Sequence, residues 1–288
     1  MKLYRFFLVL LLMPQMSWSA ELVAPLILMD KAKNLLHLAD YDPQKYKIIK
    51  TFHATTGRVK GDKTDEGDLK TPEGIYFFTA HLTPPSLKKK FGVRAFYMNY
   101  PNPYDKMAGR TGFDIMLHAT DTPERLKKDF DSEGCIVLSN EDIDSVKKYI
   151  SLKSTPILVF SELSDSWLYP EKDKKLYEFI HQWITAWKNK DVEKYIHGYH
   201  SEFSYKGKNL KQWKQYKESL NKRYHTIEID VSSPRFYRHP KYSVVTFEQD
   251  YRSKNKKGRT LFRSKGLKKL FIAQEQGEYK IISEQFNP

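Results

Sequence analysis

Cysteine is nearly absent from this 288-residue chain, which contains only Cys135. A single cysteine cannot form a disulfide within the chain, so Cys135 is an intermolecular bridge, a buried inert thiol or a reactive nucleophile. Long apolar runs are missing after the first residues, and a membrane-spanning helix needs about 20 apolar residues. His197 and His200 stand three apart without a further set of metal ligands. The sequence therefore predicts no metal site and no cofactor.

The first 20 residues have the pattern of a signal peptide. Lys2 and Arg5 precede a short apolar run over 6–13, and small residues follow at Ser17 and Ser19. This pattern predicts cleavage near residue 20 and export of the mature chain, while an uncleaved N-terminal anchor is the alternative. Exported proteins normally use cysteines in pairs, because their compartment oxidises thiols. The lone thiol is therefore unusual and needs an explanation from its neighbours.

Charge divides the chain into two parts. The whole chain has 49 basic and 35 acidic residues, and the first 170 residues hold 23 and 21 of them, which leaves 26 and 14 for the remainder. Together with the length, this predicts two domains, 21–162 and 171–288, joined by a linker over 163–170. In an exported protein the basic second domain favours an anionic wall polymer or lipid surface over nucleic acid, and a merely solvated lysine-rich surface is the alternative.

The first predicted domain is mainly β. Short apolar runs alternate with turn residues from 22 to 160, and a polar, glycine-spaced loop over 57–74 leads into a strand over 75–81. One helix is expected after Ser139 or Asn140, either of which can cap it. Many short strands with one or two small helices predict a β-sandwich or an open barrel.

The second predicted domain is α+β. Its first helix has one apolar face, which is expected to form core rather than a ligand box, made of Leu176, Phe179, Ile180, Trp183, Ile184 and Trp187. Two further helices follow over 192–200 and 209–223, and then four long, partly alternating strands to residue 286. Helices followed by a curled antiparallel sheet predict an α+β cone.

Cys135 has neighbours that suit nucleophilic chemistry. His118 ends one predicted strand and Cys135 begins another, directly after Gly134. A thiol attacks as thiolate, so it needs a base such as histidine nearby. Gly134 allows a tight turn that can direct its own N–H group and that of Cys135 toward a carbonyl oxygen, as an oxyanion hole requires. A cysteine and a histidine alone are a weak signal.

A longer pattern resembles a known family. "HAT" at 118–120 and "SEGCIVL" at 132–138 are similar to the His and Ser-His-Gly-Cys signature of the L,D-transpeptidase catalytic (YkuD-type) family of bacterial wall enzymes. "TPEGIYFF", "RAFYMNYPNPYD" and "STPILVF" match further segments in the same order, so the resemblance covers roughly residues 22–160. It implies Cys135 as nucleophile, His118 as general base, Gly134 in the oxyanion hole and Ser132 as a residue that orients the loop.

The chain departs from the usual family pattern near the thiol. Glu133 replaces the histidine before Gly-Cys, Val137 replaces an arginine, and Ala119 replaces a glycine. The first two changes resemble the branch that hydrolyses rather than cross-links, and we place Glu133 and Ala119 among the substrate-binding residues.

The resemblance also implies a segment that faces the substrate. It contains Arg94, Tyr97 and Asn99. Arg94 can pair with a carboxylate of the substrate or form a surface salt bridge, and both readings stay open.

The second domain resembles the nuclear-transport-factor-2-like (SnoaL-like) fold, and the two domains in this order resemble the L,D-carboxypeptidases that shape helical bacterial cells. The resemblance implies a periplasmic enzyme that acts on peptidoglycan stem peptides and removes the terminal D-alanine of tetrapeptides through a thioester. The alternatives are an L,D-transpeptidase, an amidase that detaches wall-bound lipoprotein, and a non-catalytic wall-binding protein.

Overall fold

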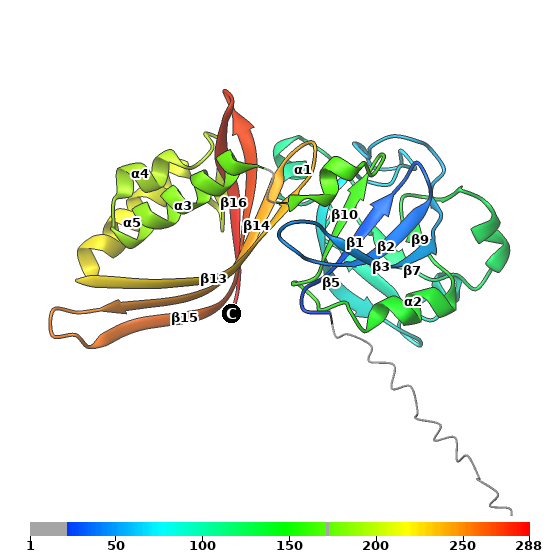
Figure 1. Ribbon diagram of the computed structural model, residues 1–288, viewed down its shortest axis with the longest axis horizontal. Coiled ribbons are helices and arrows are strands. Elements are labelled where there is room, and N and C mark those ends of the chain that lie inside the picture. Colours follow the sequence, from blue (N-terminus) through cyan, green and yellow to red (C-terminus); the bar gives the residue numbers. More distant parts are fainter. Residues whose placement is uncertain (1–21, 171–172) are drawn as a thin grey trace, which may run out of the picture.

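The computed structural model describes residues 22–170 and 173–288 (Figure 1). The predicted signal peptide lies outside the described residues. Within them, no helix is both long and apolar enough to cross a membrane. The chain forms two domains side by side, and the predicted fold class is confirmed: a curled β-sheet domain is followed by an α+β cone.

The first domain is built on one curled, mixed sheet of eight strands, which agrees with the open-barrel form of the prediction. Its spatial order is β3 (Lys47–His53), β2 (Leu35–Asp40), β1 (Pro25–Asp30), β10 (Pro156–Phe160), β5 (Gly74–Leu82), β6 (Ala95–Met98), β7 (Met116–His118) and β9 (Ile136–Val137). A separate parallel pair joins β4 (Thr56–Gly57) to β8 (Phe130–Ser132). Most neighbours in the large sheet are antiparallel, but β1 pairs with β10, and β7 with β9, in parallel.

Two α-helices accompany this sheet. Helix α2 (Asn140–Lys147) begins where the sequence predicts, because the Ser139 side chain accepts a hydrogen bond from the Asp142 N–H and so caps the helix. Helix α1 (Pro103–Met107) was not predicted; its short turn is closed by a capping box between Asn102 and Asp105. The 3₁₀ helices η1 (Lys89–Phe91), η2 (Pro123–Lys127) and η3 (Asp165–Leu168) complete the irregular parts.

The second domain packs three helices against a long antiparallel sheet (Figure 1). The helices are α3 (Lys174–Lys188), α4 (Val192–His197) and α5 (Leu210–Arg223), and the sheet order is β13 (Thr226–Arg238), β14 (Ser243–Lys254), β15 (Thr260–Glu275) and β16 (Glu278–Asn287). A small ladder joins β11 (Ser204–Tyr205) to β12 (Lys208–Asn209). The predicted apolar helix face lies in this core, with Leu176, Ile180 and Trp183 at most 3% exposed.

The two domains share a hydrophobic core. One buried cluster joins Ile75 and Phe160 of the first domain to Tyr242 and Phe271 of the second. The Tyr242 hydroxyl accepts a hydrogen bond from the Ile75 N–H (2.6 Å) and another from the Asn102 amide (2.5 Å). Buried polar contacts of this kind fix one relative orientation, because breaking them leaves unpaired groups. The predicted domain limits remain a prediction, although η3 of the expected linker buries Leu168 in this shared core.

Candidate active site

Sheet register brings Cys135 and His118 to one face. Strands β7 and β9 pair with Leu117 opposite Ile136 and His118 opposite Val137. Continued by one residue, this register puts Cys135 opposite Met116. Side chains alternate along strands, so Cys135, Met116 and His118 point to the same side. Leu117 and Ile136 are fully buried in the domain core on the other side.

A hydrogen bond to the backbone fixes the orientation of the His118 imidazole. It is 2% exposed, and its Nδ1 lies 2.5 Å from the Ala119 carbonyl oxygen. A carbonyl only accepts, so Nδ1 carries the proton and Nε2 has a free lone pair. The Phe91 ring packs edge-on against the imidazole, with centroids 4.8 Å apart. Burial lowers the pKa of His118 to about 4, and the positive charges of nearby Arg125 and Lys90 act in the same direction.

The Cys135 thiol rests in its protonated form. Burial of the sulfur raises the pKa of Cys135 to about 11, and the negative charges of Asp114 and Glu133 contribute, although the residue as a whole is only partly buried. The thiol donates weakly to the Asp114 carbonyl oxygen at 3.6 Å. A protonated thiol and a neutral imidazole on one face suit a mechanism in which the base removes the proton as attack begins, as in serine hydrolases, rather than one with a preformed ion pair.

Ser132 and Gly134 form the turn before the thiol. The Ser132 hydroxyl donates to the Cys135 carbonyl oxygen (2.6 Å) and accepts from the Gly134 N–H (3.1 Å). Gly134 has φ +124°, and a Cβ atom there would stand 2.8 Å from the Lys70 carbonyl oxygen, so only glycine suits the position. These contacts tie Ser132 to the residues on both sides of the thiol turn, and its orienting role stays a prediction. The Gly134 N–H is bound to the Ser132 hydroxyl in this structure, so of the two predicted oxyanion donors only the Cys135 N–H is not engaged by that hydroxyl; the oxyanion roles of both stay predictions.

Tyr97 is the candidate substrate-binding residue that the structure brings to the thiol. It pairs with Met116 across β6 and β7 and packs in one small cluster with Cys135. Burial raises the pKa of the Tyr97 phenol, and the negative charge of Asp114 adds to the rise. Its hydroxyl therefore stays a hydrogen-bond donor at neutral pH.

The other candidate residues lie around the site with mainly structural contacts. Arg94 pairs with Asp144 of α2 (2.5 Å), so the salt-bridge reading describes this structure. The Asn99 side chain accepts from the Phe77 N–H (2.7 Å) and so joins β5 to the end of β6. Ala119 is buried and supplies the carbonyl oxygen that orients His118, whereas Glu133 is exposed beside the thiol.

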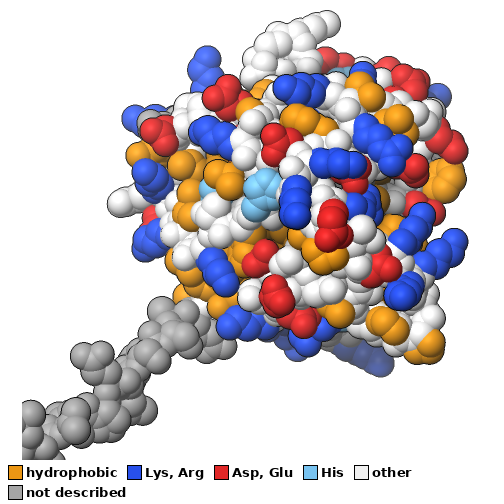
Figure 2. All heavy atoms as spheres, turned by 90° about the vertical axis from the view of Figure 1, so that its right-hand side faces the viewer, with side chains coloured by type: hydrophobic (Ala, Val, Ile, Leu, Met, Phe, Trp, Pro, Cys, Tyr) orange, Lys and Arg blue, Asp and Glu red, His pale blue; other side chains and the backbone are white. Residues whose placement is uncertain are grey.

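Sequence reasoning missed two groups at the site. Asp114, at φ +57°, supplies the carbonyl oxygen that accepts a weak hydrogen bond from the thiol, and Phe91 comes from η1 to cover His118. An aspartate directly before an apolar strand tolerates this left-handed conformation, which is the only signal that marks it. Figure 2 shows the end of the molecule formed by this domain, where basic and acidic side chains are interspersed, in keeping with its near balance of charge.

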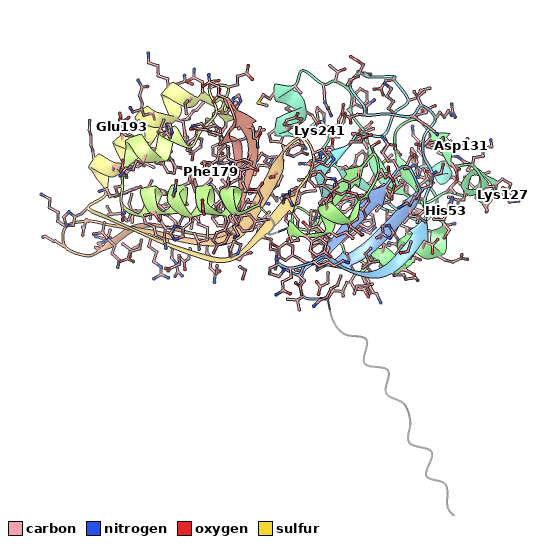
Figure 3. The ribbon with its side chains drawn as sticks, turned by 45° about the horizontal axis from the view of Figure 1, so that its top comes forward. His53, Lys127, Asp131, Phe179, Glu193 and Lys241 are labelled. Atoms are coloured by element: carbon pink, nitrogen blue, oxygen red, sulfur yellow. The ribbon has the colours of Figure 1, made fainter. Side chains whose placement is uncertain are left out.

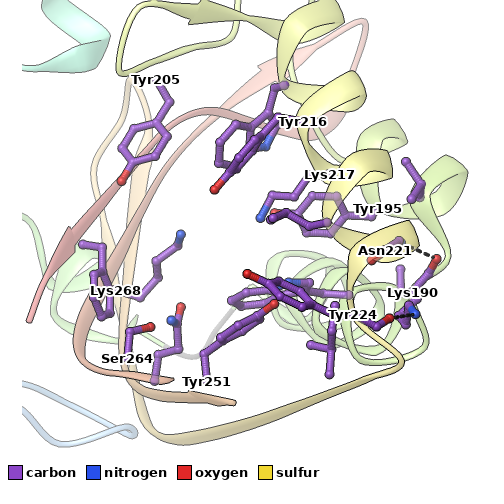
Figure 4. Close-up of a pocket in the computed structure, with 18 of the residues that line it drawn as sticks. Lys190, Tyr195, Tyr205, Tyr216, Lys217, Asn221, Tyr224, Tyr251, Ser264 and Lys268 are labelled. Atoms are coloured by element: carbon purple, nitrogen blue, oxygen red, sulfur yellow. Dashed lines mark hydrogen bonds between the residues drawn. The ribbon is translucent and has the colours of Figure 1, made fainter. Parts of the chain in front are cut away.

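The second domain contains a cavity of about 360 Å³ between its helices and β14 and β15 (Figure 4). The ammonium group of Lys217 from α5 lies 4.4 Å from the Trp213 ring centroid and 5.0 Å from that of Tyr195. Burial lowers the pKa of Lys217 to about 8. Lys268 on the facing wall is paired with Glu284, which is fully buried. Trp187 of the predicted core face also lines this cavity. The apolar face of α3 therefore packs in the core and also borders the cavity at one edge.

The curled sheet, with a cysteine and a histidine on one face, has the architecture of a YkuD-type catalytic domain. The family described as the L,D-transpeptidase catalytic domain (YkuD) matches residues 24–159, and the Cds6 C-terminal NTF2-like domain matches residues 175–285. The structure of Bdellovibrio bacteriovorus Bd1075 is similar over 92% of both chains, with 32% identity and a TM-score of 0.75. The chain belongs to this family of two-domain proteins, with a YkuD L,D-transpeptidase catalytic domain and a C-terminal NTF2-like domain.

Two other relatives are informative. The helical cell shape determining protein Pgp2 from Campylobacter jejuni is 25% identical, with 91% of both chains covered and a TM-score of 0.67. The putative L,D-transpeptidase YafK of Escherichia coli (strain K12) is 30% identical over 104 residues. That match covers 36% of this chain and 36% of YafK, so the chain spans about a third of the length of the curated relatives it matches.

Proposed function

We propose that this protein is a cysteine-dependent peptidoglycan L,D-carboxypeptidase of the cell envelope, which removes the terminal D-alanine from stem tetrapeptides. The observation that carries the proposal is the placement of Cys135 and a neutral His118 on one face of the YkuD sheet, with the Ser132–Gly134 turn next to the thiol. The similarity to the helical cell shape determining protein Pgp2 supports a role in cell shape, and the YkuD family of the catalytic domain supports a periplasmic location.

The residues support a two-step acyl transfer. His118 Nε2 takes the thiol proton as Cys135 Sγ attacks the carbonyl carbon between diaminopimelate and D-alanine. The Cys135 N–H stabilises the oxyanion, the C–N bond breaks, and the proton passes from His118 to the leaving amine. Water then attacks the thioester with His118 again as base, which releases the tripeptide carboxylate and restores the thiol. Transpeptidation replaces this water with the amine of a second stem.

Hydrolysis is favoured over cross-linking by the residues around the thiol. Valine at position 137 supplies no cationic side chain where the family usually has an arginine. Val137 is fully buried in β9, and its N–H and carbonyl bind the backbone of Thr55. Glu133, in the place of the usual histidine, is exposed beside the thiol. These are the two departures that resemble the hydrolytic branch of the family.

The decisive experiment is mass spectrometry of disaccharide tetrapeptide incubated with the mature protein. We expect a tripeptide product and free D-alanine. Adding D-methionine in a parallel sample separates the alternatives: exchange into the stem, or cross-linked dimers, would identify a transpeptidase. If the tetrapeptide is untouched, a wall-lipoprotein conjugate becomes the substrate to test, and the carboxypeptidase proposal fails.

We further propose that the cavity of the second domain binds the wall while the first domain cuts it. Lys217 gives the cavity a positive charge and lies among the rings of Trp213, Tyr195 and Trp187, a lining that suits an anionic glycopeptide. Lys217→Met is expected to weaken binding to purified peptidoglycan about tenfold, since one charge-assisted contact is lost. Co-sedimentation measures this, with Lys256→Met as matched control on the exposed β14–β15 turn. If both variants lose the same affinity for peptidoglycan, or if Lys217→Met binds as well as the wild type, the cavity is not a specific binding site.

A further inference from the structure

The hairpin between β13 and β14 places a lysine against the catalytic domain. Lys241 lies in this connection, at the junction of the two domains in Figure 3. Its ammonium group forms an ion pair with Asp62 and donates to the Glu73 carbonyl oxygen at 3.1 Å. Both partners belong to the polar loop over 58–73 of the first domain. The second domain therefore contacts this loop through a charge.

A second lysine holds the same loop from inside the catalytic domain. Lys31, only 6% exposed, donates to the carbonyl oxygens of Gly61 (2.5 Å) and Thr71 (2.8 Å) and to the Glu73 carboxylate (2.9 Å). The Asp62 carboxylate accepts from the Glu73 N–H (2.7 Å). The two ends of the loop are thus joined by a partly buried charge network to which Lys241 contributes. Such networks favour one geometry, because removing one partner leaves the remaining charges less well paired.

The loop over 58–73 contacts the Ser132–Gly134 turn that precedes the thiol. The Thr71 hydroxyl accepts from the Gly57 N–H (2.9 Å), and Gly57 pairs with Ser132, the residue that binds the Cys135 carbonyl. The Lys70 carbonyl packs where a Gly134 side chain would be. A shift of the loop would therefore move the turn that presents the thiol.

A second connection links Asp62 to the thiol through the segment over 110–114. Arg110 pairs with Asp62 (2.5 Å) and with the fully buried Asp105 (3.2 Å). The next residue, Thr111, donates its N–H to the Thr64 carbonyl oxygen (2.9 Å). Four residues after Arg110, the Asp114 carbonyl oxygen accepts a weak hydrogen bond from the thiol. Asp62 therefore links Lys241 to both segments that support Cys135, the loop over 58–73 and the segment over 110–114.

We propose that Lys241 is a positioning residue for the thiol of Cys135, so that the second domain completes the active site of the first. The inference rests on the proposed function only in naming Cys135 as the nucleophile. Lys241 touches no reacting atom; it acts through Asp62 and Glu73. Loss of its charge relaxes the loop over 58–73 and the segment over 110–114, and the thiol then becomes more accessible but less well placed for attack.

The test uses the full chain with Lys241→Met and two readouts. Misplacement of a nucleophile by a fraction of an ångström costs about tenfold or more in kcat, and we expect that loss with little change in KM. Alkylation by iodoacetamide can occur only at Cys135, the single cysteine. Exposure removes the cause of its high pKa, so more thiolate forms at pH 8 and labelling should accelerate about fivefold or more. A purely destabilising effect would not lower turnover and raise labelling in the folded protein.

Controls keep the result decisive. Lys241→Arg retains the charge and should restore most of both readouts, while Lys256→Met removes a lysine of the same domain far from the junction and should change neither. Thermal unfolding is measured for each variant. If Lys241→Met fails to fold, Asp62→Asn breaks the same contact from the catalytic side and must give the same acceleration of labelling. Wild-type labelling and kcat in either folded variant overturn the inference. Labelling needs no substrate, so it tests positioning even if the tetrapeptide is not cleaved.

Discussion

Cys135→Ala is expected to reduce tetrapeptide hydrolysis to background, a loss of about 10³-fold or more, because the nucleophile of a covalent mechanism has no substitute. His118→Ala should give a comparable loss, and the double variant should lose little more, since the two residues act as one unit. Product is measured by liquid chromatography and mass spectrometry. Thermal unfolding of Cys135→Ala should stay close to wild type, because the residue is small and only partly buried.

The pH dependence gives an independent check of the same pair. His118 must be neutral to act as base, and burial lowers its pKa to about 4, so kcat/KM should stay near its plateau well below pH 6.5 and fall only toward pH 4. The same lowered pKa makes the stability of the fold depend on pH. Below pH 6.5 the unfolded chain takes up a proton at His118 that the buried imidazole of the folded chain does not. His118 therefore lowers stability as pH falls from 6.5 toward 4. An acid limb near pH 6.5 would contradict a buried, neutral base.

Local structure could largely be read from the sequence, because it depends on neighbouring residues. Ser139 caps α2 through its own hydroxyl, and the apolar spacing of α3 places Ile180 and Trp183 in the core. Sheet pairing could not be read in this way. The parallel pairing of β7 with β9 joins segments separated by a long loop, and only this register puts Cys135 and His118 on one face. Motif resemblance supplied the pair, whereas its geometry came from the fold.

The charged residues at the domain junction show the same limit more strongly. Lys31, Asp62, Arg110 and Lys241 lie far apart in the chain, and each one alone has the pattern of a solvated surface charge. Their grouping into one network appears only in the fold, where the β13–β14 hairpin adds Lys241 to the contacts of the loop over 58–73. Asn99 illustrates the converse, since a polar side chain expected to face substrate instead binds the Phe77 backbone. Long-range contacts decided both outcomes.

Lys268→Met is expected to destabilise the second domain by about 3–5 kcal/mol at neutral pH, because it leaves a buried carboxylate without its partner. Glu284 is fully buried, pairs with Lys268 and accepts hydrogen bonds from the hydroxyls of Tyr199 and Tyr195. Urea unfolding followed by tryptophan fluorescence measures the change, since Trp183, Trp187 and Trp213 all lie in this domain's core. Lys265→Met, an exposed position on the same strand, is the matched control.

The loss in Lys268→Met should depend on pH in a direction that identifies its cause. In the wild type, Lys268 and Lys217 hold the pKa of Glu284 below its usual value despite burial, so this carboxylate contributes stability above pH 4.5 that is lost as pH falls. Without Lys268, burial raises that pKa, and protonation at acid pH relieves the unpaired charge. The difference between variant and wild type should therefore shrink as pH is lowered toward 5. The double variant Lys268→Met with Glu284→Gln should recover most of the stability at neutral pH, because no unpaired buried charge remains. An equal loss of stability in the single and double variants would mean that packing of the Lys268 stem, rather than its charge, stabilises this wall of the cavity.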